Sequence, residues 1–226
     1  MSEESLSQES HVRVRSKIGS RDDQRRIRAI DSELTCGRRA ELLRRPCPEV
    51  TEYNSEVAGR SAKSRLKKKY SYKIVATPVG SLTLVASDDG LAAILWENDN
   101  PRRVRLNIGA EDKTHPVLLE TERQLKEYFD RQRKSFNLCL DFVGTKFQSK
   151  VWNALLEIPF GETRSYTEIA RRIGSPKAVR AVGAANSRNP VSIVAPCHRV
   201  IGANGDLTGF AGGLQVKGFL LSLERA

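Results

Sequence analysis

The chain has few of the residues that mark secreted, membrane-spanning or zinc-binding proteins. Its four cysteines, Cys36, Cys47, Cys139 and Cys197, lie far apart in the sequence and form no CxxC pair. This spacing excludes the common zinc motifs and a disulfide-dense scaffold. No apolar run is long enough to span a membrane, and the N-terminus lacks the apolar core of a signal peptide. We therefore expect a soluble protein of a reducing compartment, with free thiols.

Aromatic residues are also scarce, at 6% of 226 residues, and they are unevenly spread. Residues 1–69 contain one aromatic, Tyr53, among many Arg, Ser, Glu and Lys side chains. A segment with so few large apolar groups cannot bury a core, so we expect a disordered basic arm, with enough helical spacing for a short helix around Asp22–Leu43. Apolar periodicity begins at about Tyr70, and residues 70–226 are long enough to fold around a core.

Negative charge is in the minority. The chain carries 38 Lys and Arg against 27 Asp and Glu, a formal net charge of +11. Residues 1–69 account for +6 and the rest for +5, so both parts are basic. This balance favours an anionic partner such as nucleic acid. The basic run Ser61–Lys69 is interpreted as a solvated linker, with nonspecific phosphate contact as the alternative.

The first patterns of the folded part are typical of strands. The segments Tyr72–Thr77, Leu82–Ser87 and Leu91–Trp96 predict a three-stranded antiparallel meander, with Asp89-Gly90 as a hairpin turn. Further along the chain, the periodicity predicts a helix over Pro116–Arg131, a strand over Phe136–Phe142 and a helix over Thr145–Leu156.

A pair of short helices is predicted next. Ser165 is followed three residues later by Glu168, which is the pattern of a capping box, and Gly174 favours a helix end. Ser175 and Pro176 are typical of a helix start. Two helices joined by a short glycine turn have helix-turn-helix architecture, although an ordinary helical hairpin gives the same pattern. The predicted helices are Tyr166–Ile173 and Ser175 to about Ala185.

The second of these helices has an unusual surface for a DNA-reading element. A helix that reads the major groove normally carries several long polar side chains. Here a single arginine, Arg180, stands among small residues, which suits close approach to a narrow groove and insertion of the arginine into the base stack. The small residues are Ala178, Ala181, Gly183, Ala184 and Ala185.

Cys197 is the candidate nucleophile. It lies in the run Pro196–Val200, after the apolar residues Val191, Ile193 and Val194, which predict a thiol at the end of a buried strand. A thiol attacks only as thiolate, so its pKa must be lowered by a nearby cation or hydrogen-bond donor. The next two residues, His198 and Arg199, are candidates for that role. A buried structural cysteine is the alternative.

Together these motifs resemble the O6-alkylguanine-DNA alkyltransferases, the methylated-DNA–protein-cysteine methyltransferase family. The resemblance is strong over residues 147–224, looser over 70–142, and does not reach residues 1–69. The matching segments keep the family's order, without gaps from Tyr166 to Glu224. They are residues 158–163, Ser165-Tyr166, 177–183, Asn189-Pro190, 196–200 and 209–213.

The resemblance implies an α+β fold in two lobes. Residues 70–142 would form a ribonuclease-H-like lobe built on an antiparallel sheet. Residues 143–226 would form the helical active-site and DNA-binding domain, with a helix-turn-helix of winged-helix type. Residues 1–69 would precede both as the basic arm.

The same resemblance implies direct-reversal DNA repair. The protein would flip O6-methylguanine, and O4-methylthymine, out of duplex DNA and transfer the alkyl group irreversibly to Cys197, once per molecule. It would need no cofactor and no metal. Its partner would be double-stranded DNA, bound through the minor groove with little sequence preference by a monomer. It would work in the cytoplasm of a prokaryote or the nucleus of a eukaryote.

The resemblance also assigns catalytic roles. Cys197 would be the acceptor, His198 would act as its base through a water, and Glu224 would orient the histidine. Asn189 would tie the segment before the cysteine to the helix-turn-helix. Tyr166 would protonate or hydrogen-bond N3 of the leaving guanine and help to rotate its phosphate.

Further residues would hold the flipped base and the DNA. Arg180 would fill the hole that the base leaves in the stack. The carbonyls of Cys197 and Val200 would read the exocyclic amine, the amide of Ala211 would bond O6, and Phe210 would wall the pocket. The remaining positions of the expected DNA and pocket surface are Ala178, Ala181, Ala184, Asn186 and Gly212, with Asn186 affecting tolerance for bulky alkyl groups.

Other interpretations exist for these residues. Tyr166 could be a packing residue, Arg180 a solvated charge, Asn189 a turn former and Glu224 a fraying terminal acid. The main alternative function is a DNA-binding module that recognises alkyl lesions without transfer, which would not need Cys197. A cysteine hydrolase or a thiol peroxidase is a second alternative, but it would need a distant histidine or a resolving cysteine.

Overall fold

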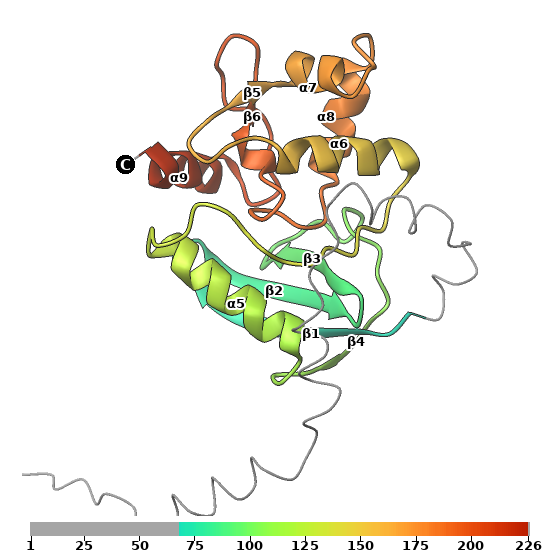
Figure 1. Cartoon of the computed structure of the whole chain (residues 1–226), viewed down its shortest axis with the longest axis vertical. Coiled ribbons are helices and arrows are strands. Elements are labelled where there is room, and N and C mark those ends of the chain that lie inside the picture. The colour runs from blue at the N-terminus through green and yellow to red at the C-terminus, as the bar shows by residue number, and fades with distance from the viewer. Residues whose placement is uncertain (1–67, 226) are drawn as a thin grey trace, which may run out of the picture. The chain divides into compact units, whose positions relative to one another are not determined.

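The computed structural model describes residues 68–225, all of which belong to one compact unit of the chain (Figure 1). The predictions for the basic arm and for a helix around Asp22–Leu43 lie outside the described residues. None of the described helices is long and apolar enough to cross a membrane. The described residues also contain no group of three or more His, Cys, Asp and Glu side chains suited to a metal ion.

The N-terminal half is a four-stranded sheet. β1 (Tyr70–Thr77), β2 (Gly80–Ser87) and β3 (Gly90–Trp96) form the predicted antiparallel meander. A fourth strand, β4 (Ile108–Glu111), pairs parallel with β1, so the sheet order is β3-β2-β1-β4 and the sheet is mixed. The expectation of a purely antiparallel sheet is therefore wrong, because β4 adds a parallel strand. β4 has four residues, mostly exposed, and these are too few to show alternation in the sequence.

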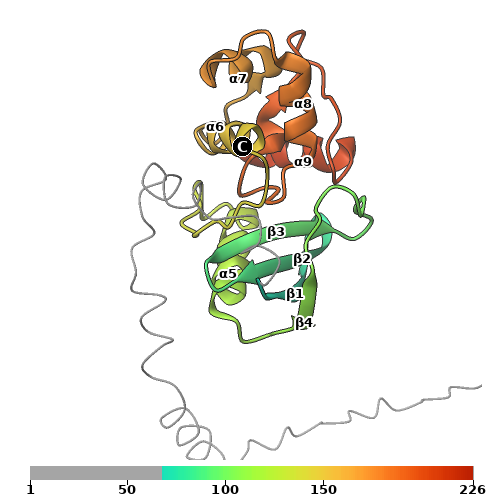
Figure 2. The same cartoon turned by 90° about the vertical axis from the view of Figure 1, so that its right-hand side faces the viewer.

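Helix α5 (Pro116–Phe129) lies across one face of the sheet (Figures 1 and 2). It confirms the helix predicted from Pro116, and it ends two residues earlier than expected, just before Arg131 takes a left-handed φ of 60°. Its buried residues Leu118, Leu125 and Tyr128 recur at helical spacing and pack against apolar side chains of β2 and β3.

The strand predicted over Phe136–Phe142 does not form. The segment contacts β3 only around Leu91, which donates its amide to Cys139 O at 2.8 Å and accepts from Asp141 N at 2.8 Å. Its alternating apolar side chains still pack on the core, which explains the misleading pattern. The approach is close, because a Cβ on Gly90 would lie 2.4 Å from the Cys139 carbonyl oxygen. Gly90 also has a φ of +149°, so a larger residue is excluded both by this clash and by the backbone conformation.

The C-terminal half is helical. It contains α6 (Lys146–Leu156), α7 (Tyr166–Arg172), α8 (Val179–Ser187) and α9 (Leu214–Arg225). A short two-stranded parallel ladder joins β5 (Arg164–Ser165) to β6 (Val200–Ile201). The helix predicted over Thr145–Leu156 is confirmed, with Thr145 as its N-cap in a capping box with Gln148. Figure 2 shows these helices gathered beside the β3 side of the sheet.

The helix pair is confirmed, with corrected helix boundaries. Ser165 and Glu168 form the predicted capping box of α7, and Gly174 follows the helix with a φ of +72°. The second helix, α8, begins at Val179 rather than at Ser175. Residues 175–178 form a turn instead, in which Ala178 N donates to Ser175 O at 2.9 Å. The helix then continues to Ser187, two residues beyond the predicted end.

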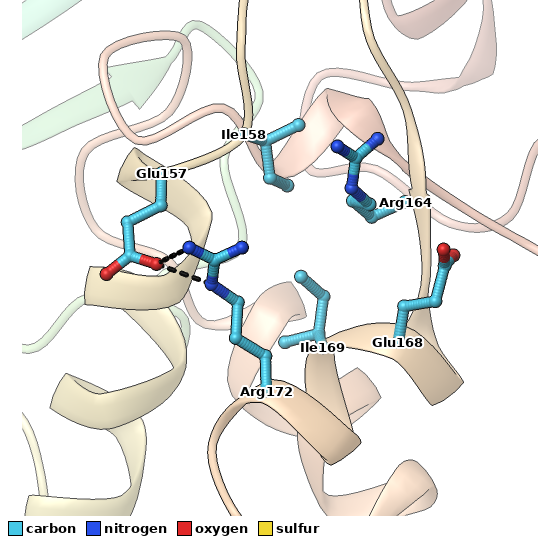
Figure 3. Close-up of a pocket in the computed structure, with 6 residues that line it drawn as sticks. All are labelled: Glu157, Ile158, Arg164, Glu168, Ile169 and Arg172. Carbon is cyan, nitrogen blue, oxygen red and sulfur yellow. Dashed lines mark hydrogen bonds and ion pairs between the residues drawn. The ribbon is translucent and has the colours of Figure 1, made fainter.

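A small cavity of about 130 Å³ lies where the end of α6 meets α7 (Figure 3). Its charged side chains have partners close by: Arg172 pairs with Glu157, and Glu168 accepts from the backbone and hydroxyl of Ser165. The cavity is lined by Glu157, Ile158, Arg164, Glu168, Ile169 and Arg172.

Candidate active site

Cys197 begins a single 3-10 turn, η1 (Cys197–Arg199), and it is only 3% exposed. The strand expected before it is absent. Val191 makes one isolated bridge to Ile94, and the chain then turns, with Ile193 held at a φ of 73°. A left-handed conformation is costly for a β-branched residue and persists only where the surroundings impose it. The apolar run that predicted a strand is therefore a buried, strained turn.

Asn189 stabilises this turn. Its side-chain Nδ2 donates to Ala195 O at 2.7 Å, and its Oδ1 accepts from Val191 N at 3.1 Å. Both contacts are buried. Asn189 directly follows the C-cap of α8, so it connects the helix-turn-helix to the segment that carries the thiol.

The thiol is protonated at rest. Burial raises the pKa of Cys197, and a hydrogen bond from the Asn189 side chain together with the positive charges of Arg103 and Lys217 acts in the opposite direction without offsetting it. A group that takes up the thiol proton is therefore needed before sulfur can attack.

His198 is fully buried beside the cysteine, and its Nε2 lies 2.7 Å from Glu224 Oε1. Burial lowers the pKa of His198, although the hydrogen bond and charge of Glu224 act to raise it, so the imidazole is neutral near pH 7. A neutral ring that donates from Nε2 to a carboxylate has an acceptor at Nδ1. That Nδ1 is buried and has no hydrogen-bond partner among residues 68–225.

Glu224 is a buried hub rather than a fraying terminal acid. Besides His198, its carboxylate accepts from Arg199 Nε and Nη2 at 2.8 and 2.9 Å, and from the Tyr128 hydroxyl at 2.7 Å. Gly161 N adds a longer contact at 3.3 Å. Burial alone would raise the pKa of Glu224, but the hydrogen bonds from His198 and Arg199 lower it to about 2.

Two of these donors change the sequence interpretation. Arg199 was a candidate for lowering the thiol pKa, but its guanidinium is committed to Glu224 and to Ile158 O at 2.6 Å. Tyr128 comes from α5, and no local pattern in the sequence connects it to a glutamate 96 positions away.

Lys217 is a second residue that the sequence interpretation missed. It is fully buried and donates from Nζ to Val200 O at 2.6 Å and to Thr208 O at 3.0 Å. Thr208 in turn shares a 2.9 Å hydrogen bond with the Tyr166 hydroxyl. The lysine thus connects α9 to the strand after the thiol and to the loop that holds Tyr166. Its signal in the sequence, a single cation among apolar helix residues, is not specific.

A cavity of about 580 Å³ opens next to Tyr166. Phe210 and Ala211 line it from the glycine-rich loop, and Gly183 lines it from α8. Phe210 packs edge-on against Trp96 at 5.4 Å and against His198 at 6.4 Å. Gly212 fits directly on the Trp96 ring, where a Cβ would come within 2.9 Å. The loop predicted to wall the pocket is therefore supported from β3.

The outer surface of α8 matches its sequence pattern. Arg180, Ala181 and Ala184 are exposed, and Ala178 is the half-buried N-cap. Asn186 instead lies in the interior, and its Oδ1 has no hydrogen-bond partner within the described part of the chain. Val200 is fully buried, with its carbonyl already accepting from Lys217, and the Cys197 carbonyl accepts from Val200 N. Each of these carbonyls retains a second lone pair.

Two family models match nearly all of the described chain. The ribonuclease-like domain of 6-O-methylguanine DNA methyltransferase matches residues 70–142, and the DNA binding domain of the same enzyme matches residues 146–226. The chain belongs to the O6-methylguanine DNA methyltransferase family. As a member of this family it is a DNA-binding repair methyltransferase, the methylated-DNA–protein-cysteine methyltransferase that the motifs predicted.

Individual relatives agree. The chain is 49% identical over 156 residues to the methylated-DNA–protein-cysteine methyltransferase of Methanosarcina acetivorans, covering 68% of this chain and 97% of the relative. It is 58% identical over 149 residues to the Mycobacterium leprae enzyme, covering 66% and 88%. A crystal structure of Mycobacterium tuberculosis OGT in complex with DNA matches with a TM-score of 0.63 and 44% identity, covering 68% and 92%.

Proposed function

We propose that Cys197 is the acceptor in this methyltransferase, and that the buried His198–Glu224 pair activates it. The observation that carries the assignment is the neutral imidazole next to the thiol, held by Glu224 through Nε2 and with an Nδ1 that has no hydrogen-bond partner among residues 68–225. A bridging water between Nδ1 and the thiol would pass the proton from sulfur to the ring. The arrangement follows the nucleophile–base–orienter order of other activated nucleophiles.

The transfer itself is an in-line displacement at the alkyl carbon. A sulfur–carbon bond forms as the bond between that carbon and O6 of guanine breaks, so the thioether stays on Cys197 and guanine is restored. The proton that leaves the thiol balances the proton that the departing guanine gains. Tyr166 would supply or stabilise that proton at N3, from a hydroxyl held in place by Thr208.

The raised pKa of the Cys197 thiol limits its side reactions before a lesion binds. Because burial keeps Cys197 protonated, the resting protein has little thiolate to lose to other electrophiles. Neither a base nor water would cleave the thioether product to regenerate the thiol, so each molecule would repair one lesion. O6-methylguanine is the primary substrate in this proposal, with O4-methylthymine as a second.

The cavity next to Tyr166 would receive the flipped base. Phe210 would wall it, and the exposed Ala211 would offer its amide to O6. The carbonyls of Cys197 and Val200 would use their second lone pairs to accept from the exocyclic amine. Asn186 is buried, and its amide oxygen has no hydrogen-bond partner in the described part of the chain, so it would influence which alkyl groups fit.

The exposed, small-residue surface of α8 would lie in the minor groove, with Arg180 filling the gap left by the flipped base. Ala178, Ala181 and Ala184 would allow the close approach. Such contacts read groove shape and phosphates, so binding would show little sequence preference and strong salt dependence. We propose a monomer that acts in the intracellular compartment where DNA is found.

A stoichiometric titration tests the proposal. Increasing amounts of a duplex carrying one O6-methylguanine are added to a fixed amount of protein, and restored guanine is counted by nuclease digestion and chromatography. We expect restoration to stop at one lesion per protein molecule, and to be absent with Cys197→Ser. Tight and selective binding without any restored guanine would instead support the lesion-recognition module.

A further inference from the structure

The cavity proposed to receive the flipped base has a wall that comes from the N-terminal half. The loop after β3 contributes Asp99, Asn100, Arg102 and Arg103 to the same 580 Å³ space that Tyr166 lines from α7. The resemblance and the family match for DNA binding concern the C-terminal half, residues 146–226, so neither assigns this loop a role.

Buried contacts fix the loop against the active-site segment. Arg103, with a side chain only 4% exposed, pairs with Asp99 and donates to Ile94 O at 2.8 Å. It also donates to the backbone carbonyl of Asn189, the residue that clamps the turn before the thiol. Asp99 in addition accepts from Trp96 N at 3.2 Å. The loop is therefore a built wall of the cavity.

Arg102 is exposed on this fixed loop. Its backbone amide is held by Asn100 Oδ1 at 2.9 Å, while its side chain has no ion pair or hydrogen bond among residues 68–225. Arg188, the exposed C-cap residue of α8, lines the same cavity and its side chain is likewise unpaired within the described chain. The one acidic residue of the lining, Asp99, is neutralised by Arg103.

We propose that the loop after β3 is part of the DNA-binding surface, and that Arg102, with Arg188 from α8, binds the phosphate backbone beside the flipped nucleotide. The inference rests on the proposed function, because it places the nucleotide in this cavity. Two guanidinium groups without a partner among the described residues line a cavity that would admit a base, and they fit the phosphates attached to that base. The N-terminal half would then bind the DNA strand from which the base is flipped, next to α8.

Salt dependence distinguishes a phosphate contact from a structural one. Each phosphate that a protein neutralises contributes about 0.9 to the slope of log affinity against log salt on duplex DNA. Arg102→Ala should therefore weaken duplex binding about tenfold at low salt and reduce that slope by about one. Arg188→Ala should have a similar effect.

Arg105→Ala is the matched control. Arg105 is exposed on the same segment and carries the same charge, but it does not line the cavity. The three variants and the wild type are compared for duplex affinity by fluorescence anisotropy across salt concentrations. Methyl or benzyl transfer is measured in parallel on a lesion duplex and on the free base O6-benzylguanine, which has no phosphate.

The expected result is that Arg102→Ala loses affinity and duplex transfer far more than Arg105→Ala does, with a much smaller loss on the free base. Equal effects of Arg102→Ala and Arg105→Ala would overturn the proposal. Equal losses on duplex and free base would also overturn it, because they would indicate a damaged pocket. Failure of the wild type to transfer from either substrate would instead refute the proposed function itself.

Discussion

The charged groups of the proposed active site and those of the proposed DNA-binding surface are organised in opposite ways. Around η1, His198, Arg199 and Glu224 are buried, and most of their polar atoms have a partner. On α8 and the loop after β3, Arg180, Arg188 and Arg102 are exposed and no hydrogen bond or ion pair of their side chains is found among the described residues. Proton transfer needs groups fixed in advance, whereas phosphate binding needs charges that are still available.

This comparison predicts that substitutions in the buried network act on chemistry and stability, and that substitutions on the surface act on DNA affinity. The largest effect is expected at the thiol. Cys197→Ser should abolish alkyl transfer while leaving duplex affinity within about twofold, since a serine hydroxyl fits the site but is a far weaker nucleophile. Transfer is measured by loss of the lesion, and binding by anisotropy. Residual transfer would show that another residue accepts the group.

Removal of the Glu224 charge should have the next largest effect. Glu224→Gln leaves the buried Arg199 guanidinium without its counter-charge, which typically costs about 3–5 kcal/mol of unfolding free energy. Urea denaturation measures the change. Glu162→Gln is the matched control, because Glu162 also pairs with an arginine but is 50% exposed. A similar small loss in both variants would contradict the hub role of Glu224.

Acid should weaken the same network. The folded-state pKa of Glu224 is about 2, below the ordinary value of 4.5, so its contribution is complete above pH 4.5 and is lost as the pH falls towards 2. The loss is on the order of 2–3 kcal/mol of unfolding free energy. Unfolding free energies are compared at pH 5 and at about pH 3 in wild type and Glu224→Gln. An equal pH dependence in both proteins would contradict the assignment.

A surface substitution should separate binding from chemistry. Arg180→Ala should reduce repair in duplex about 30-fold, equivalent to about 2 kcal/mol, because the flipped state loses the side chain that fills the stack. Transfer from free O6-benzylguanine should change much less. Rates on both substrates are measured under single-turnover conditions. Equal losses would refute the intercalating role.

The smallest effect is expected at the edge of the buried network. Tyr128→Phe keeps the ring but removes one donor from the Glu224 carboxylate, at a cost of about 1.5 kcal/mol of unfolding free energy. The carboxylate should then attract the His198 proton more strongly and raise the pKa of His198. The acid side of the pH profile for transfer should therefore move to higher pH. Tyr72→Phe is the control, and an unshifted profile would make Tyr128 purely structural.

The sequence predicted the local features well because they depend on neighbouring residues. The β1–β3 meander, the Ser165–Glu168 capping box and the small surface of α8 all follow from periodicity, turn chemistry and residue size. The resemblance correctly indicated the family. The roles of Cys197, His198, Tyr166 and the other assigned site residues remain predictions.

The missing parts depend on distant or strained geometry. The apolar run before Cys197 fits a strand by pattern, but Asn189 holds it in a turn with Ile193 left-handed. Tyr128 and Lys217 reach the site from α5 and α9, and no local signal connects them to it. The four residues of β4 were too short to show a period.

Peptide mapping after repair tests the central claim most directly. The protein is incubated with a duplex carrying one O6-methylguanine, and its intact mass and protease fragments are measured. We expect one added methyl group per molecule, located on the peptide that contains Cys197, together with restored guanine. A methyl group on another residue, or restored guanine with an unmodified protein, would contradict it.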